Sequence, residues 1–305
     1  MKARRIIGDI VVYIILTILA VIWVLPIVWL VLQSFSARGY GGASSFIPTE
    51  FWFGNYAGLA TNTVVSTNGS TSSSMYNFFG YVENGTLYLG AFVNTLLIAL
   101  FCMVIATIMT LATAYAFSRL RFKARTGFMR VILILGMFPG FLSLIIMYWF
   151  MDTIGIRQTI WSLIIIYSGG AGMGYYISKG FFDTISKQID EAAMIDGATR
   201  FQIFYKIIMP LSKPIVVYTA LTAFMSPWGE YITASYVLGS ANVEKTNWTV
   251  AILLNNMLAV EDGRRGKYWG QFCAGAVIVA IPVAIVFLCM QRYYVSGVTG
   301  GAVKG

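Results

Sequence analysis

Residues 91–117 read AFVNTLLIALFCMVIATIMTLATAYAF, a run without a single charged side chain. As a helix this run would be about 40 Å long, more than the roughly 30 Å of hydrocarbon in a bilayer. Five further apolar runs of similar length occur elsewhere in the chain. The sequence therefore predicts six transmembrane helices, at 10–33, 91–117, 131–151, 158–178, 214–238 and 269–290.

The composition supports an all-α integral membrane protein. Hydrophobic residues make up 58% of the chain and charged residues 11%, whereas about a quarter of the residues in soluble domains are charged. The net charge of +9 is spread in short clusters between the apolar runs, so no nucleic-acid partner is expected. The sequence contains no histidine, which excludes His-based triads and His metal sites, and we predict no metal site.

The distribution of basic residues predicts the orientation. With the N-terminus inside, 15 of the 21 Lys and Arg residues fall on the cytoplasmic side, so both termini are predicted to be cytoplasmic. The first apolar run is longer than the h-region of about 7–15 residues in a signal peptide, which favours a retained anchor over a cleaved signal. The expected parts are an N-terminal transmembrane helix at 1–33, an extracytoplasmic loop at 34–90, a five-helix core at 91–290 and a cytoplasmic tail at 291–305.

The cytoplasmic segment 179–213 is too polar to span a membrane, yet it is patterned. Ser186 can cap a short helix that Gly197 would end through a left-handed backbone. Thr199 and Gln202 fit a capping box that opens a second helix. That second helix is predicted to carry an apolar stripe at i, i+3, i+4 and i+7, formed by Phe201, Phe204, Tyr205 and Ile208.

The first of these two helices is narrow at Ala192 and Ala193 and is predicted to have an acidic rim of Asp190, Glu191 and Asp196. Such a helix suits insertion into a cleft on another protein. An amphipathic helix that lies on the lipid surface is the alternative, and patterning alone does not choose between them.

Residues 191–198, EAAMIDGA, followed by Ile208-Met209-Pro210-Leu211 and Pro214, resemble the EAA loop of bacterial ABC-importer permeases. The resemblance implies a type I (MetI-like) permease fold whose coupling helices dock into two separate ATPase subunits. It assigns the ATPase-coupling role to Glu191, Ala192, Ala193, Asp196 and Gly197. The sequence has no G-x-x-x-x-G-K-[ST] phosphate loop. We therefore expect a transport subunit, not an enzyme, which binds no cofactor while its partners hydrolyse ATP with Mg.

Two further stretches, residues 136–144 (GMFPGFLSL) and the tail 291–305, resemble the MalG-like permeases of maltose/maltodextrin importers. The resemblance implies import of an oligosaccharide through the bacterial cell membrane. It also implies a MalF-like second permease and an extracytoplasmic sugar-binding protein as partners. A tail of this type reaches the ATPase subunits, which assigns ATPase contacts to Gly300, Gly301 and Lys304; a frayed terminus is the alternative.

The stretch Gly239–Tyr268 corresponds, by the same resemblance, to a loop that contacts the binding protein; an ordinary surface connection is the alternative. Its candidate contacts are Asn242, Trp248, Asn255 and Asn256. Four glycines in the span 158–178 are expected to allow close helix packing: Gly169, Gly170, Gly172 and Gly174.

Glu230 is the one acidic residue well inside a predicted span, in the stretch Pro227-Trp228-Gly229-Glu230-Tyr231. A carboxylate is costly in lipid, so it is expected to face the helix bundle or the transport pathway. Contact with a sugar hydroxyl, a structural hydrogen bond and proton coupling remain open as its role. The candidate pathway residues are Asn94, Trp228, Glu230 and Tyr231.

Three functional classes compete at this stage: an ABC permease for maltodextrin or another sugar, an ion-coupled secondary transporter, and a membrane enzyme. An ion-coupled transporter predicts several intramembrane charges or an inverted repeat. An enzyme predicts a nucleophile or an acid/base pair. The EAA-like loop and the missing phosphate loop favour the ABC permease.

Overall fold

The computed structural model describes residues 2–37, 46–65, 71–73, 77–83, 86–137, 140–170, 174–239, 247–258 and 268–302. By the packing of its backbone the chain divides into two units. The first comprises Met1–Phe78 and Leu253–Ala280, and the second comprises Phe79–Ile252 and Ile281–Gly305. The helices α13 (Val250–Leu258) and α14 (Trp269–Ala302) each contribute residues to both units.

The first unit contains the long helix α1 (Lys2–Ser34), followed by the short helix α2 (Gly54–Thr61). A small antiparallel hairpin of β1 (Thr63–Val65) and β2 (Thr71–Ser73) comes next. The part of α1 that is long and apolar enough to cross a membrane, Gly8–Ser34, is exposed on all sides along most of its length. A helix that is hydrophobic all round and uncovered by its own chain is suited to lipid or to neighbouring helices.

The end of α1 is fixed by hydrogen bonds within this unit. The buried Asn55 side chain in α2 donates to the backbone carbonyls of Ser34 (3.0 Å) and Ser36 (2.9 Å). The Gln271 side chain in α14 donates to the carbonyl of Thr63 at 2.7 Å. The region predicted as an extracytoplasmic loop therefore contains ordered structure, including strands that the sequence pattern did not indicate.

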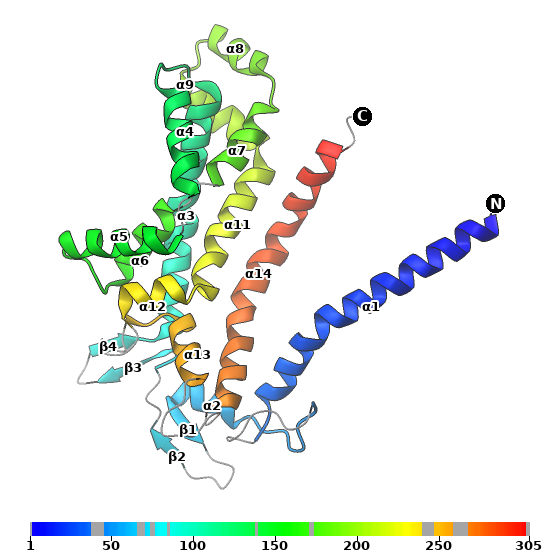
Figure 1. Ribbon diagram of the computed structural model, residues 1–305, viewed down its shortest axis with the longest axis vertical. Helices are drawn as coiled ribbons and strands as arrows, with labels where there is room; N and C mark the ends of the chain where they lie inside the picture. Colours follow the sequence, from blue (N-terminus) through cyan, green and yellow to red (C-terminus); the bar gives the residue numbers. More distant parts are fainter. Residues whose placement is uncertain are drawn as a thin grey trace. The chain divides into compact units, whose positions relative to one another are not determined.

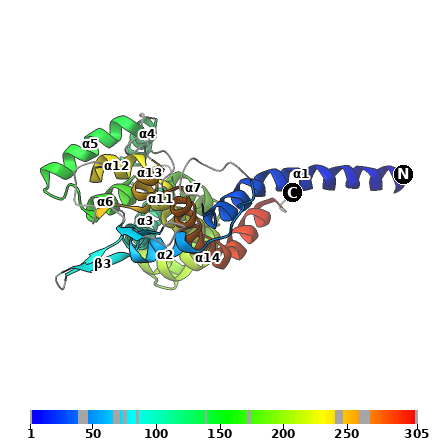
Figure 2. The ribbon, with the colours of Figure 1, turned by 90° about the horizontal axis from the view of Figure 1, so that it is seen from below.

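The second unit is built around α3 (Ala91–Arg119), which packs against α6 (Ile160–Gly169), α7 (Gly174–Asp183) and α11 (Lys213–Gly229). The hairpin of β3 (Gly80–Glu83) and β4 (Thr86–Leu89) precedes α3. This hairpin lies at one end of α3, and the helices α8 and α9 lie at the other end (Figure 1). Figure 2 shows the hairpin, labelled at β3, extending away from the helices of the same unit.

Three helices of the described residues are individually long and apolar enough to cross a membrane: Gly8–Ser34, Ala91–Arg119 and Trp269–Tyr293. They correspond to three of the six predicted spans. Two bent helix pairs could add one span each. The first pair, Ile160–Gly169 with Gly174–Asp183, bends by 41°, and the second, Arg200–Leu211 with Lys213–Gly229, bends by 86°.

The predicted span 131–151 is two helices, α4 (Arg125–Gly136) and α5 (Gly140–Thr153). The sequence carries Pro139 before Gly140, and proline disfavours helical backbone in the residue that precedes it. The predicted span 214–238 is also divided, into α11 and α12 (Ile232–Leu238). A continuous apolar run thus did not imply a continuous helix.

The glycines of span 158–178 mark the interval between α6 and α7. Close helix packing, which the sequence led us to expect, does not explain the two of them that flank this interval. A Cβ added at Gly169 would meet no atom within 4 Å, and one at Gly174 would meet only Thr110 Cγ2 at 3.6 Å. Gly172 lies outside the described residues.

Candidate functional site

The segment from Ser186 to Gln202, here called the docking segment, folds as the sequence predicted. The helix α8 (Lys187–Ile195) is capped by Ser186 Oγ, which accepts a hydrogen bond from the backbone N–H of Gln188 at 3.3 Å. Gly197 adopts φ +83°, a left-handed backbone that glycine reaches without steric cost. Gly197 lies just after the end of α8, where the chain turns toward α9 (Arg200–Gln202).

A capping box opens α9, as predicted. The backbone N–H of Thr199 donates to Gln202 Oε1 at 2.8 Å, and the N–H of Gln202 donates to Thr199 Oγ1 at 3.3 Å. Both bonds satisfy amides that the first turn of a helix leaves without intrahelical partners. The helix–turn–helix of the docking segment is therefore confirmed.

The apolar stripe predicted for the second helix, which starts in α9, is not buried as one face of the subunit. Phe201 and Tyr205 are 73% and 65% exposed, whereas Ile203 and Ile208 are fully buried. The reason is that Ile203–Ile208 forms a π-helix, η1, before the short helix α10 (Met209–Leu211). Hydrogen bonds from i to i+5 widen the turn, so residues five apart share a face.

The outward surface of α8 and the turn that follows it carry most of the predicted coupling residues. Glu191, Ala192, Asp196 and Gly197 are all exposed, and between them Ile195 is 87% exposed. Ala193 instead points inward, into a buried cluster that includes Tyr115 and Phe182. The predicted coupling residues therefore lie where a partner could reach them, and Ile195 adds one uncovered apolar side chain among them.

Asp190 does not belong to an acidic rim, which corrects the prediction. Its side chain is 5% exposed and forms an ion pair with Arg119 at the end of α3, with 3.2 Å between Asp190 Oδ2 and Arg119 Nε. Arg119 also donates from Nη2 to the carbonyl of Ile185 at 2.8 Å. The last turn of α3 is thus joined to the start of the docking segment.

Two neighbouring contacts tie α3 to the same region. Ser118 Oγ donates to Asp183 Oδ1 at the end of α7, at 2.6 Å. One turn earlier, the Tyr115 hydroxyl donates to the carbonyl of Arg200 in α9 at 3.3 Å. Side chains of one transmembrane helix therefore contact the structure before, within and after α8.

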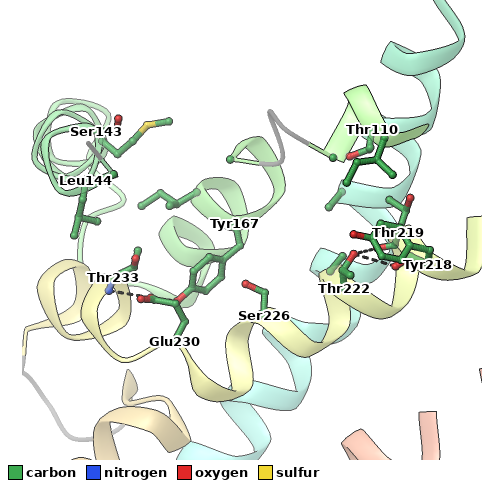
Figure 3. A pocket seen from close by; sticks show the side chains of 18 residues that line it. Thr110, Ser143, Leu144, Tyr167, Tyr218, Thr219, Thr222, Ser226, Glu230 and Thr233 are labelled. Atoms are coloured by element: carbon green, nitrogen blue, oxygen red, sulfur yellow. Dashed lines mark hydrogen bonds between the residues drawn. The ribbon is translucent and has the colours of Figure 1, made fainter. Parts of the chain in front are cut away.

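A second candidate site is a cavity of about 630 Å³ within the second unit, in the size range of ligand pockets. The helices α3, α5, α6, α7, α11 and α12 contribute its lining. Figure 3 shows Tyr167 and Glu230 meeting on one side, with Ser143 and Leu144 of α5 across from them. Eight lining side chains carry hydroxyl groups: Thr110, Ser143, Tyr167, Tyr218, Thr219, Thr222, Ser226 and Thr233.

Glu230 is the one charged residue among the described residues that line this cavity. It lies between Gly229, the last residue of α11, and the start of α12, inside the predicted span 214–238. Its Oε2 accepts hydrogen bonds from the Tyr167 hydroxyl (3.1 Å) and from the backbone N–H of Thr233 (2.9 Å). A helix broken at membrane depth is tolerated where its backbone lines a cavity.

The cavity contains residues that the sequence analysis missed, although a signal for them was present. Tyr218, Thr222 and Ser226 follow one another at intervals of four, so they lie along one face of α11, and Glu230 continues the spacing just after the helix ends. Figure 3 shows the members of this polar stripe facing the cavity. A polar stripe along one face of an apolar span was the pattern that could have identified them.

The other three predicted pathway residues do not line the cavity. Asn94 is 2% exposed and donates to the carbonyl of Trp248 at 3.1 Å, joining α3 to the residues before α13. Trp228 is 5% exposed and packs edge-on against Phe92 at 5.5 Å between ring centroids. Tyr231 is half-buried outside the lining. Of the four candidates, the structure places only Glu230 at the cavity.

The remaining predicted contacts fall in two places. The helix α14 continues to Ala302, so Gly300 and Gly301 are helical, while Lys304 lies outside the described residues. The stretch Gly239–Tyr268 contains α13 and is therefore not entirely loop. Within this stretch Trp248 is buried, Asn255 is exposed, Asn256 is half-buried and Asn242 lies outside the described residues.

Long apolar helices, a hydroxyl-lined cavity at a broken helix and a protruding helix–turn–helix fit a membrane transport subunit. The chain belongs to the family of binding-protein-dependent transport system inner membrane components, whose model matches residues 104–300. It is thus a multi-pass cell-membrane permease of an ABC importer, and not an enzyme. Membership of this family implies a partner permease, ATPase subunits and a binding protein.

Several proteins are similar to the chain over its full length. The galactooligosaccharides transport system permease protein GanQ of Bacillus subtilis (strain 168) is 34% identical over 306 residues, covering 100% of this chain and 99% of GanQ. The maltodextrin transport system permease protein MdxG of the same organism is also 34% identical, with the same coverage.

A solved structure supports the fold. It is a bacterial ABC transporter involved in the import of the acidic polysaccharide alginate. It matches with a TM-score of 0.72 and 23% identity, covering 96% of this chain and 98% of that chain. The predicted type I, MetI-like permease fold is therefore confirmed.

Proposed function

We propose that this permease imports neutral oligosaccharides, with maltodextrins as the first candidate. Relatives that transport maltodextrins and match the chain at 32–34% identity over its full length support this choice. Galactooligosaccharides are the second candidate, because GanQ is similar to the same degree. Both substrate classes are uncharged chains of hexoses that expose many hydroxyl groups.

The observation that carries the proposal is the chemistry of the cavity. Its hydroxyl side chains can both donate to and accept from sugar hydroxyls, and the carboxylate of Glu230 is a strong acceptor. Among the described residues no donor contacts Glu230 Oε1, which leaves that oxygen available to a substrate hydroxyl. The aromatic faces of Tyr167 and Tyr218 suit the apolar faces of sugar rings.

The same lining argues for an uncharged substrate. The described residues around the cavity include no Lys or Arg, and their one charge is negative. An acidic oligosaccharide would place its carboxylates near Glu230 without a compensating cation, in a site where a low dielectric strengthens repulsion. A neutral sugar meets no such cost.

Energy for transport comes, in this proposal, from two separate ATPase subunits that hydrolyse ATP with Mg. Glu191, Ala192, Asp196 and Gly197 lie on the exposed surface of the docking segment, where an ATPase cleft could receive them. Ala193 supports the same surface from the inner side of α8. Movement of the ATPase pair would then shift the docking segment and alternate the access of the cavity between the two sides.

Two further contacts complete the proposed assembly. The C-terminal end, including Gly300, Gly301 and Lys304, would contact the ATPase subunits. The residues before α14, including Asn242, Asn255 and Asn256, would face the extracytoplasmic sugar-binding protein. Trp248 is 6% exposed and would support this region from inside, without touching the partner.

The test is an ATPase assay on the purified complex with its second permease, ATPase subunits and binding protein. A panel of maltodextrins, galactooligosaccharides and acidic oligosaccharides would be compared. The proposal predicts that neutral oligosaccharides stimulate ATP hydrolysis and that acidic ones do not. Stimulation by acidic sugars alone would contradict it.

A further inference from the structure

We infer that the Arg119–Asp190 ion pair is the joint through which movement of the docking segment reaches the transmembrane helix α3. This inference rests on the proposed docking of α8 to an ATPase subunit. Arg119 and Asp190 are positioning residues here, since neither lies on the exposed docking surface. Their side chains are 1% and 5% exposed, which places the joint behind that surface.

The Arg119 side chain contacts both α8 and a residue just before α8. Its Nε lies 3.2 Å from the Asp190 carboxylate inside α8, and its Nη2 donates to the Ile185 carbonyl, just before α8, at 2.8 Å. A guanidinium is planar and rigid, so a single side chain fixes both points relative to each other. Any displacement of α8 must therefore either carry α3 with it or break these contacts.

The chain itself offers α8 little rigid support. On one side α8 follows the turn after α7, and on the other it ends at the left-handed Gly197. A Cβ at Gly197 would meet no atom within 4 Å, so no side-chain packing holds the turn at this position. Beside the apolar contacts of Ala193, the Arg119–Asp190 ion pair therefore links α8 directly to a membrane-spanning helix.

Stability alone is a poor explanation for this pair. Removing two charges from water is expensive, and apolar residues of similar volume often serve a fold equally well. The pair is also incompletely satisfied: within the described part of the chain, Arg119 Nη1 and Asp190 Oδ1 have no hydrogen-bond partner. An ion pair that is costly and incompletely bonded fits a role in fixing the register of two elements.

Apolar packing is the competing explanation for the attachment of α8, and it can be separated from the ion pair. Ala193 packs into a cluster with Tyr115, Phe182 and Ile203, next to the pair but independent of its charges. A double variant, Arg119→Met with Asp190→Leu, keeps volume and packing while it removes the charged fork. The single variants Arg119→Met and Asp190→Asn remove one partner each.

The experiment uses the full complex in proteoliposomes and measures maltodextrin imported per ATP hydrolysed. We expect each single variant and the double variant to lower this ratio by about tenfold, the usual size of a coupling between sites. ATP hydrolysis itself should continue, because the substitutions are in the permease and leave the ATPase subunits unchanged. Arg121→Met is the matched control: Arg121 is an exposed cation two residues away and should leave the ratio unchanged.

A double variant that assembles and imports the wild-type amount of sugar per ATP would overturn the inference, even if the single variants fail to fold. The same result from assembled single variants would also overturn it. A wild-type complex that imports no sugar with ATP would instead contradict the proposed function. The two failures are therefore distinguishable.

Discussion

Tyr167 in α6 donates a hydrogen bond of 3.1 Å to Glu230, which lies where α11 ends. The bond joins two helices across one side of a hydroxyl-lined cavity and holds the carboxylate toward that space (Figure 3). A second bond, from the Thr233 backbone at 2.9 Å, binds the same oxygen. The carboxylate is therefore held in place by the protein while one of its oxygens remains open to the cavity.

Replacement of Glu230 by Gln should weaken sugar transport. The amide keeps the size of the side chain and an acceptor oxygen but loses the charge; a hydrogen bond to a charged group exceeds a neutral one by about 1–1.5 kcal/mol, roughly 5–10-fold in affinity. The concentration of maltodextrin that half-stimulates ATP hydrolysis should rise accordingly. Tyr231→Phe is the control, since Tyr231 is next in sequence and does not line the cavity. An unchanged half-stimulating concentration in Glu230→Gln would remove Glu230 from the pathway.

Tyr167→Phe should have a smaller effect in the same assay. Glu230 would keep its charge and the Thr233 bond, and only one neutral donor would be lost, worth about 0.5–1.5 kcal/mol. We therefore expect a shift of a few fold in the half-stimulating concentration. A larger loss than that of Glu230→Gln would mean that Tyr167 contacts the sugar directly and is the more important of the two groups.

A bulky side chain at Ser226 should block the cavity. Ser226 is exposed to it from the middle of the polar stripe on α11, so Ser226→Trp would fill space that the substrate needs. Import by the assembled complex should fall to background. Met225→Trp is the matched control, because Met225 is the adjacent exposed residue and does not line the cavity. Equal import by the two variants would show that the substrate travels elsewhere.

Gly197 provides a test of the docking segment. Glycine adopts this φ of +83° without strain and asparagine adopts it readily, whereas the left-handed backbone costs a β-branched residue about 1–2 kcal/mol of conformational energy. Because a Cβ at this position meets no atom of the permease within 4 Å, valine adds no clash within the subunit, and asparagine serves as a control for added size on the exposed surface. Gly197→Asn should import sugar nearly as well as the wild type, and Gly197→Val should lose coupling of ATP hydrolysis to import. Normal coupling in Gly197→Val would mean that the turn does not set the position of α8.

Glu191→Ala should uncouple ATP hydrolysis from import without destabilising the permease. Glu191 is exposed on α8, so its removal leaves no buried group unpaired. Thermal unfolding of the purified subunit should be unchanged, while sugar-stimulated ATPase activity of the complex should fall. Full stimulation in this variant would count against docking through the exposed surface of α8.

The features that sequence analysis predicted well depend on neighbours along the chain. The Ser186 cap, the left-handed Gly197 and the Thr199–Gln202 capping box are each made within a few residues, so their signals are local. The sequence also identified Glu230, because an isolated acidic residue in an apolar span can be recognised from the sequence alone.

The features that were missed depend on contacts between distant residues. The burial of Asp190 requires Arg119 from another helix, and nothing near Asp190 in the sequence indicates that partner. The π-helix η1 places Ile203 and Ile208 in a cluster with Tyr115, and this packing overrides the 3.6-residue pattern that a regular helix predicts. The breaks within the predicted spans were missed for another reason, since hydropathy reports the preferred solvent of a segment and not the continuity of its helix.

The most direct measurement of the central claim is uptake of labelled maltodextrin by proteoliposomes that contain the complete complex. ATP supplied on the ATPase side, with binding protein on the other, should drive accumulation of the neutral sugar in wild-type vesicles and not in Ser226→Trp vesicles. Accumulation driven by an ion gradient through this subunit without any ATPase, or undiminished uptake through Ser226→Trp, would contradict an ATP-driven sugar pathway through the Glu230 cavity.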